Sequence, residues 1–114
     1  MRVVIVWWDL ADSKAGLDEL RAFLREEAVE RFTGHPGLVR KTWISDRAAN
    51  RWGAVFLWES AEAADRPILP PRAVELIGYP PTHRAAFDVE ATVEGAAHLL
   101  AALPGLGLAH DPES

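Results

Sequence analysis

The sequence contains no cysteine, and this absence sets the first limits on its chemistry. It excludes a disulfide framework, a catalytic thiolate, and any zinc or iron–sulfur site that depends on sulfur ligands. Basic residues are also few, with 12 Lys and Arg against 17 Asp and Glu and a formal net charge of −5. Because a nucleic-acid-binding surface normally needs a basic face, we expect no nucleic-acid partner.

Several other sequence signals are missing. No stretch approaches the roughly 18 consecutive apolar residues of a membrane span, and residues 1–9 lack the pattern of a signal peptide. We therefore expect a cytoplasmic protein with no membrane partner. The glycines form no phosphate-binding loop, no serine lies in a nucleophile-elbow pattern, and no two histidines have metal-ligand spacing. The sequence thus predicts no metal and no nucleotide or flavin cofactor.

Two nearly continuous apolar runs, residues 3–8 and 53–58, are the most informative feature that is present. A strand with one face in water alternates apolar and polar residues, whereas a continuous run indicates cover on both faces of the sheet. A chain of 114 residues has room for only two or three helices, enough to cover one face. We expect a second copy of the chain to cover the other face, which predicts a homodimer.

Hydrophobic periodicity predicts a strand over residues 2–8 and then a helix that ends at Phe32. Asp12 or Ser13 is the expected N-cap of that helix, because either side chain can accept from a free amide of the first turn. The remaining elements are strands over 38–46 and 52–59 joined by a polar hairpin loop, a proline-broken helix within 60–81, and a strand over 83–92. Clean alternation in the last strand indicates an edge position.

This order of elements predicts an α+β, ferredoxin-like β-α-β-β-α-β fold with one antiparallel sheet. In that topology the first and third strands are central, and these are the two continuous apolar runs. A short helix over 94–103 would complete a single domain of residues 1–103, followed by a flexible tail over 104–114.

Residues 35–43, His-Pro-Gly-Leu-Val-Arg-Lys-Thr-Trp, followed by 53–58 and 87–89, resemble the YdhR-type monooxygenase-like proteins. These belong to the dimeric α+β barrel superfamily, which includes the antibiotic-biosynthesis monooxygenases, and the resemblance covers residues 2–93. It implies a homodimer whose two sheets face each other across a cavity. Some relatives oxidise polycyclic phenols or anthrones with molecular oxygen and no cofactor, while others degrade haem, cyclise or isomerise.

The chain departs from this resemblance in places. Haem-degrading relatives typically have an Asn on the first strand and a His on the second helix. In this chain the first strand carries tryptophans instead of that Asn, and the region of the second helix, 60–81, contains no His. Both differences disfavour haem binding. The prolines within 60–81 and the segment after residue 93 also depart from the pattern, so the mouth of the cavity is not defined by the resemblance.

Oxygenation without a cofactor needs a dry pocket, a base that removes a substrate proton, and donors that stabilise the resulting anion. The catalytic candidates are Lys41 as an oxyanion-stabilising group, His83 as the general base, and Arg84 beside it. The candidates for binding a flat substrate are Trp7, Trp43, Trp58 and Tyr79. Alternation places Lys41 and Trp43 on one face, which we expect to line the space between two sheets, with Trp7 rather than Trp8 directed toward it.

Each of these residues also has an ordinary structural interpretation. Trp43 would serve as dimer-interface core, Lys41 would extend its amine to water, and His83 would be a surface residue. The leading hypothesis is a cofactor-independent monooxygenase acting on a flat aromatic or polyketide-like molecule in a cavity between sheets. A non-catalytic small-molecule-binding or assembly dimer, and a cyclase or isomerase on the same scaffold, are the alternatives that sequence does not separate.

Overall fold

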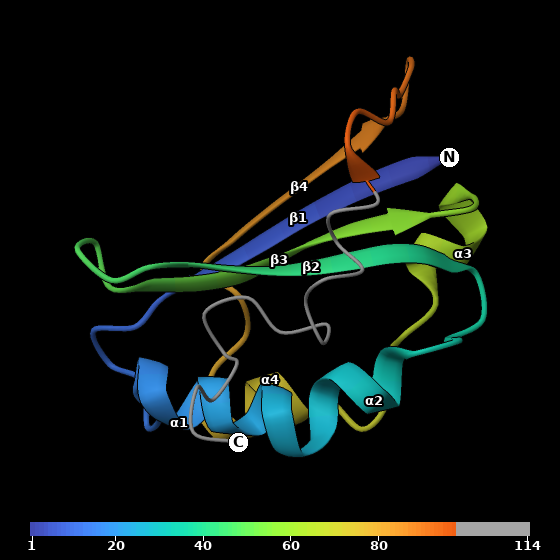
Figure 1. The fold of residues 1–114 in the computed structure, drawn as a ribbon. Coiled ribbons are helices and arrows are strands. Elements are labelled where there is room, and N and C mark those ends of the chain that lie inside the picture. The colour runs from blue at the N-terminus through green and yellow to red at the C-terminus, as the bar shows by residue number, and fades with distance from the viewer. Residues whose placement is uncertain (98–114) are drawn as a thin grey trace.

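A computed structural model describes residues 1–97 of the chain, as a four-stranded sheet with all of its helices on one side (Figure 1). The predicted C-terminal tail over 104–114, and the predicted helix over 94–103 apart from residues 94–97, lie outside the described residues.

The sheet contains four antiparallel strands in the order β2-β3-β1-β4. Their bounds are β1 Arg2–Asp9, β2 Leu38–Asp46, β3 Arg51–Trp58 and β4 His83–Asp88. This order is ferredoxin-like, so the predicted fold class is confirmed, with β1 and β3 central and β4 at an edge. The last strand ends at Asp88 instead of residue 92, because Asp88 pairs with Arg2 at the very start of β1 and no partner strand remains beyond it.

One helical stretch, made of α1 (Leu17–Phe23), η1 (Leu24–Ala28) and α2 (Val29–Phe32), runs beneath the sheet (Figure 1). It ends at Phe32 as predicted but begins later than predicted. Gly16 is the N-cap, and its backbone N–H donates to Glu19 Oε1 at 3.3 Å. Ser13 is used in the preceding turn, where its hydroxyl accepts from the backbone N–H of Ala15.

The π-helical turn η1 keeps the apolar stripe of this stretch directed at the sheet. The buried residues Leu20, Leu24, Ala28 and Phe32 recur every four positions. In an α-helix of 3.6 residues per turn, each step of four residues rotates about 40° beyond one full turn, so the stripe would drift around the helix. The wider π turn, closed by the bond from Val29 N–H to the Leu24 carbonyl, compensates for this drift. Phe32 therefore still faces the sheet.

The proline-broken second helix is confirmed as two short helices, α3 (Ala61–Asp65) and α4 (Arg72–Ile77). Ser60 caps α3, because its Oγ accepts from the backbone N–H of Ala63 at 3.0 Å. Gly78 ends α4 in a left-handed conformation with φ of 105°, which a residue with a side chain adopts only with strain.

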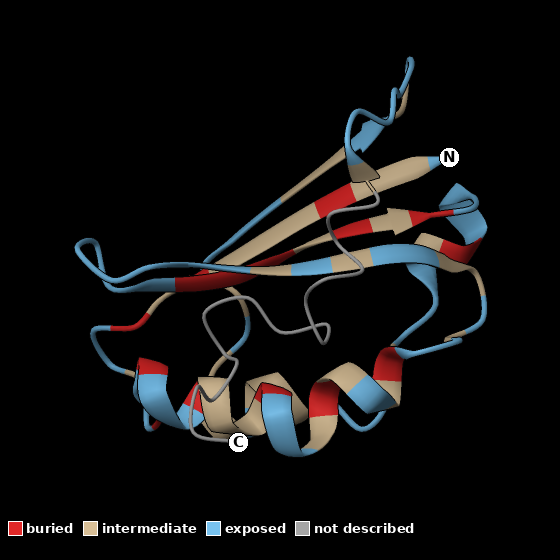
Figure 2. Cartoon of the chain, viewed as in Figure 1, coloured by how far each residue is buried: buried red, intermediate tan, exposed pale blue. Residues whose placement is uncertain are grey.

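The two faces of the sheet differ in their cover. The helix-facing side carries most of the buried residues of the strands, namely Val4, Trp8, Trp52, Ala54, Phe56 and Trp58 (Figure 2). No described element covers the opposite side, here called the open face, which carries Val3, Ile5, Trp7, Ile44, Val55, Leu57, Ala85 and Phe87. Ile44 is 40% and Phe87 56% exposed. Within residues 1–97, helices therefore cover one apolar face of the sheet, and no helix or strand covers the other.

Replacing Gly53 with alanine should destabilise the fold. Gly53 lies opposite Trp7 in the sheet, and a Cβ there would be 2.2 Å from the Val6 carbonyl oxygen and 2.8 Å from Trp7 Cβ. We expect Gly53→Ala to lower the free energy of unfolding by at least about 1 kcal/mol, because the overlap involves backbone atoms. Urea denaturation measures this, with Gly95→Ala as control, since a Cβ at Gly95 would meet no atom within 4 Å. Equal stability of both variants would contradict the packing described.

Candidate functional site

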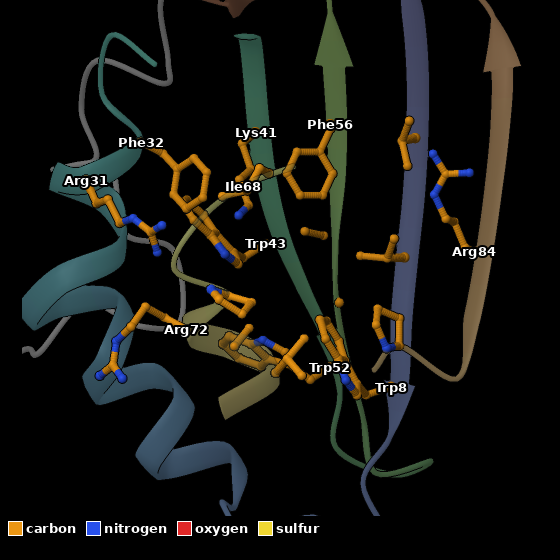
Figure 3. Close-up of a pocket in the computed structure, with 18 of the residues that line it drawn as sticks. Trp8, Arg31, Phe32, Lys41, Trp43, Trp52, Phe56, Ile68, Arg72 and Arg84 are labelled. Carbon is orange, nitrogen blue, oxygen red and sulfur yellow. The ribbon is translucent and has the colours of Figure 1, made fainter. Parts of the chain in front are cut away.

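A cavity of about 240 Å³ lies between the helix-facing side of the sheet and the helical layer (Figure 3). Seven aromatic side chains line it: Trp8, Phe23, Phe32, Trp43, Trp52, Phe56 and Trp58. Its charged lining residues are Arg31, Lys41, Arg72 and Arg84, and among the described residues no carboxylate lines it. The cavity therefore combines flat apolar walls with cationic groups, in a chain whose net charge is negative.

Small side chains at the centre of the sheet make room for this cavity. In the strand register Trp43 on β2, Ala54 on β3, Val6 on β1 and Arg84 on β4 form one row across all four strands. Ala54 and Val6 therefore form a low floor. Bulky side chains stand on neighbouring rows, such as Phe56 on one side, so the floor is bounded by aromatic walls.

Lys41 places its amine among three aromatic rings. Its Nζ lies 3.5 Å from the centroid of the Phe32 ring, 4.5 Å from that of Phe56 and 4.6 Å from that of Trp43 (Figure 3). No carboxylate within residues 1–97 pairs with it. Burial first, and then repulsion by the nearby Arg31 charge, lower the pKa of Lys41 to about 7. Near neutral pH a large fraction of Lys41 is thus a free amine, which can accept a proton.

The three arginines of the cavity are not equally available to a ligand. Arg31 donates from Nη2 to the Pro70 carbonyl at 2.8 Å. Arg72 is held by Glu27 at 3.0 Å and by Glu75 at 3.3 Å. Arg84 is exposed and makes no hydrogen bond or ion pair with the described residues. Within residues 1–97, Lys41 and Arg84 are therefore the two cationic groups of the cavity that make no hydrogen bond or ion pair with the protein.

The sequence-based prediction of the face that Lys41 and Trp43 occupy is wrong. We expected them between two sheets, but both lie on the helix-facing side. The register of β2 against β3 shifts between Leu38 and Arg40, which is an irregularity of the β-bulge type at Val39. Leu38 consequently packs on the same side as Trp43 instead of the opposite one. Simple alternation along β2 therefore misassigned its faces.

The cavity brings together four of the seven predicted site residues, namely Lys41, Trp43, Trp58 and Arg84. The other three do not line it. Trp7 lies on the open face, and the cavity is lined by Trp8 in its place.

His83 and Tyr79 have other contacts. The His83 ring stacks on Trp7 with centroids 4.7 Å apart, and its Nε2 lies 3.5 Å from Asp9 Oδ2. The Tyr79 hydroxyl donates to the Asp9 carbonyl, and the Tyr79 carbonyl accepts from Trp8 Nε1 at 2.8 Å. Tyr79 thus fixes the orientation of Trp8, which does line the cavity.

Some lining residues were not among the predicted site residues. Trp52 shares a strand face with Trp58, so alternation along β3 was a signal that could have found it. Phe32 belonged to the apolar stripe of the helix, but no pattern indicated that its ring would contact the Lys41 amine. Arg31 carried no distinguishing signal, since a charged residue next to a stripe is usually solvated.

Within residues 1–97 no three His, Asp or Glu side chains are grouped as a metal site would require. No helix in that range is long and apolar enough to cross a membrane.

Comparison with known proteins identifies the fold. No family model matches the chain, and no curated protein sequence is similar to it. Two solved structures share the architecture. A candidate antibiotic biosynthesis monooxygenase from Deinococcus radiodurans is 12% identical with a TM-score of 0.56, and SnoaB, a cofactor-independent oxygenase from Streptomyces nogalater solved in a mutant form, is 19% identical with a TM-score of 0.55. Each comparison covers 82% of this chain and 97% of the other. The chain therefore has the ferredoxin-like α+β fold of monooxygenase-like proteins.

The lowered pKa of Lys41 predicts a specific pH dependence of stability. An unfolded lysine has a pKa of about 10.4, whereas that of folded Lys41 is about 7. Between these values the unfolded chain binds more protons, so the free energy of unfolding should rise with pH across this window. Lys41→Met should lack this contribution, so any stability advantage of the variant over the wild type should be largest below pH 7 and shrink toward pH 10.

Urea denaturation from about pH 6 to pH 10 measures this difference, because other titrating groups contribute equally to both proteins. Arg40→Met is the matched control, since Arg40 is exposed. Arg40 pairs with Leu57 in the sheet, so its side chain lies on the open face, away from the cavity. A stability difference between Lys41→Met and the wild type that does not change with pH would show that Lys41 has an ordinary pKa.

Proposed function

We propose that the protein is a cofactor-independent monooxygenase of the YdhR type that acts on a flat aromatic or polyketide-like molecule. The observation that carries this proposal is the state of the Lys41 amine. Aromatic rings surround this amine in the cavity, and its pKa of about 7 leaves a large fraction of it uncharged at physiological pH. The same fold in SnoaB, a cofactor-independent oxygenase, supports it. The aromatic walls of the cavity offer flat apolar surfaces on which fused rings can stack.

Lys41 would begin the reaction by accepting a proton from the acidic CH₂ carbon of a bound anthrone. The resulting anion transfers one electron to molecular oxygen, and the two radicals combine into a peroxide at that carbon. The peroxide takes up a proton from the Lys41 ammonium and then loses water, so that a CH₂ group becomes a carbonyl. One oxygen atom enters the product and the other leaves as water, which balances atoms and electrons without a further reductant.

Other residues of the cavity have supporting roles in this proposal. Trp43 and Trp58 hold the ring system, and the Arg31 charge, close enough to influence the Lys41 pKa, favours the substrate anion. His83 has no part in the proton transfer, because it lies on the open face of the sheet. Tyr79 acts on the site only by orienting Trp8.

Removing the amine should abolish oxygen uptake. We expect Lys41→Met to reduce the rate of oxygen consumption with an anthrone by at least about 100-fold, the usual contribution of a general base. The wild-type rate should rise with pH through about 7, since the amine form is required. An oxygen electrode with anthrone panels measures both, and Arg40→Met should retain the wild-type rate.

An undiminished rate in Lys41→Met would rule out Lys41 as the base. Anthrone binding by the wild type without any oxygen uptake would instead favour the non-catalytic binding protein. Conversion of a substrate under nitrogen would favour a cyclase or isomerase.

We also propose that the protein is a homodimer joined through the open face. That face presents a contiguous set of apolar residues on all four strands, including Ile44 and Phe87, which are substantially exposed in a single chain. Large exposed apolar patches normally mark an interaction surface. A second copy supplies the same patch and so matches it in character.

Placing a charge on the open face should dissociate this dimer. We expect Phe87→Glu to give the monomer mass in light scattering at about 10 μM, because a buried unpaired carboxylate opposes association. Phe87→Leu should keep the dimer, since it retains an apolar side chain at the same position. A monomeric wild type at this concentration would contradict the proposed interface.

A further inference from the structure

We infer that the cavity accepts an elongated planar acid, whose carboxylate binds Arg84 at the mouth while its opposite end lies at Lys41. This inference rests on the proposed function only for the reaction at the Lys41 end. The binding of the acid end is argued separately from charge and geometry.

The charges of the cavity favour an anion. Four cationic side chains and no carboxylate line it among the described residues, although the whole chain is acidic. Glu27 and Glu75 neutralise Arg72, and the Pro70 carbonyl holds Arg31. Arg84 lacks such a partner, and its guanidinium presents the forked donors that bind a carboxylate through two parallel hydrogen bonds.

The strand register separates the two ends of the site. Arg84 and Trp43 lie at opposite ends of the row across the sheet, three inter-strand spacings apart, or roughly 14 Å between backbones. Lys41 is on the β2 side of this row, two residues from Trp43. Only Ala54 and Val6 occupy the floor between them. A ligand of two or three fused rings fits this span, with aromatic walls beside it (Figure 3).

The state of Lys41 also determines where the carboxylate must bind. A carboxylate next to Lys41 would stabilise its ammonium form and raise its pKa, which would remove the base at neutral pH. A carboxylate at Arg84 is held far from the amine and leaves its pKa near 7. The Lys41 amine therefore stays neutral in the presence of an acidic substrate only when the substrate's carboxylate binds at the opposite end of the cavity.

A matched pair of probes tests this inference. We expect the wild type to bind anthracene-2-carboxylate about tenfold more tightly than anthracene-2-carboxamide, as a charge-assisted hydrogen bond would give. Arg84→Gln should remove the preference by weakening the acid alone. Lys41→Met and the control Arg40→Gln should both retain it. Isothermal calorimetry gives the affinities, and circular dichroism confirms that each variant is folded.

The outcomes separate this inference from the proposed oxygenase activity. Equal affinity for the two probes in the wild type, no binding of either at about 1 mM, or a preference that survives in Arg84→Gln would each overturn the acid site. A preference that depends on Arg84 without oxygen uptake from any anthrone supports the acid site and rejects the oxygenase. Oxygen uptake without the preference rejects the acid site alone.

Discussion

The enclosure of the Lys41 amine by three aromatic rings is the contact on which the site depends. Burial of a cation is costly, and the attraction of ring faces for the ammonium opposes only part of that cost. The rings come from two layers, since Phe32 belongs to α2 whereas Trp43 and Phe56 belong to the sheet. The position of Phe32 in turn depends on the π turn that keeps the helical stripe directed at the sheet. A local irregularity in one helix thus helps to set the proton affinity of a residue on a strand.

The two apolar faces of the sheet differ in what covers them within residues 1–97. On the helix-facing side, Ala54 and Val6 leave a hollow among larger residues, and the helices close it into a cavity. On the open face, Gly53 allows the close approach of Trp7, whose ring is then stacked by His83. Within residues 1–97, helices cover one face and enclose the cavity, while the uncovered open face is the surface through which we propose that two copies associate.

The fold could be read from the sequence because its signals are long and periodic. The two continuous apolar runs correctly predicted that β1 and β3 are the central strands. The prolines correctly predicted that the second helix is broken. The face of β2 could not be predicted, since the irregularity at Val39 changes the alternation without any glycine or proline to mark it. Of the predicted site residues, Lys41 and Arg84 line one cavity, whereas His83 lies on the opposite side of the sheet.

The separation of Lys41 from Arg84 would resolve a conflict that the proposed reaction meets in a cationic cavity. Positive charge attracts an anionic substrate, but a basic amine needs surroundings that disfavour its own protonation. Burial and the Arg31 charge lower the pKa of Lys41, and a carboxylate bound beside its amine would undo their effect. Arg84 lies on the opposite edge strand, where its side chain is exposed to solvent. The width of the four-stranded sheet is what allows one cavity to hold both an anion-binding cation and a neutral base.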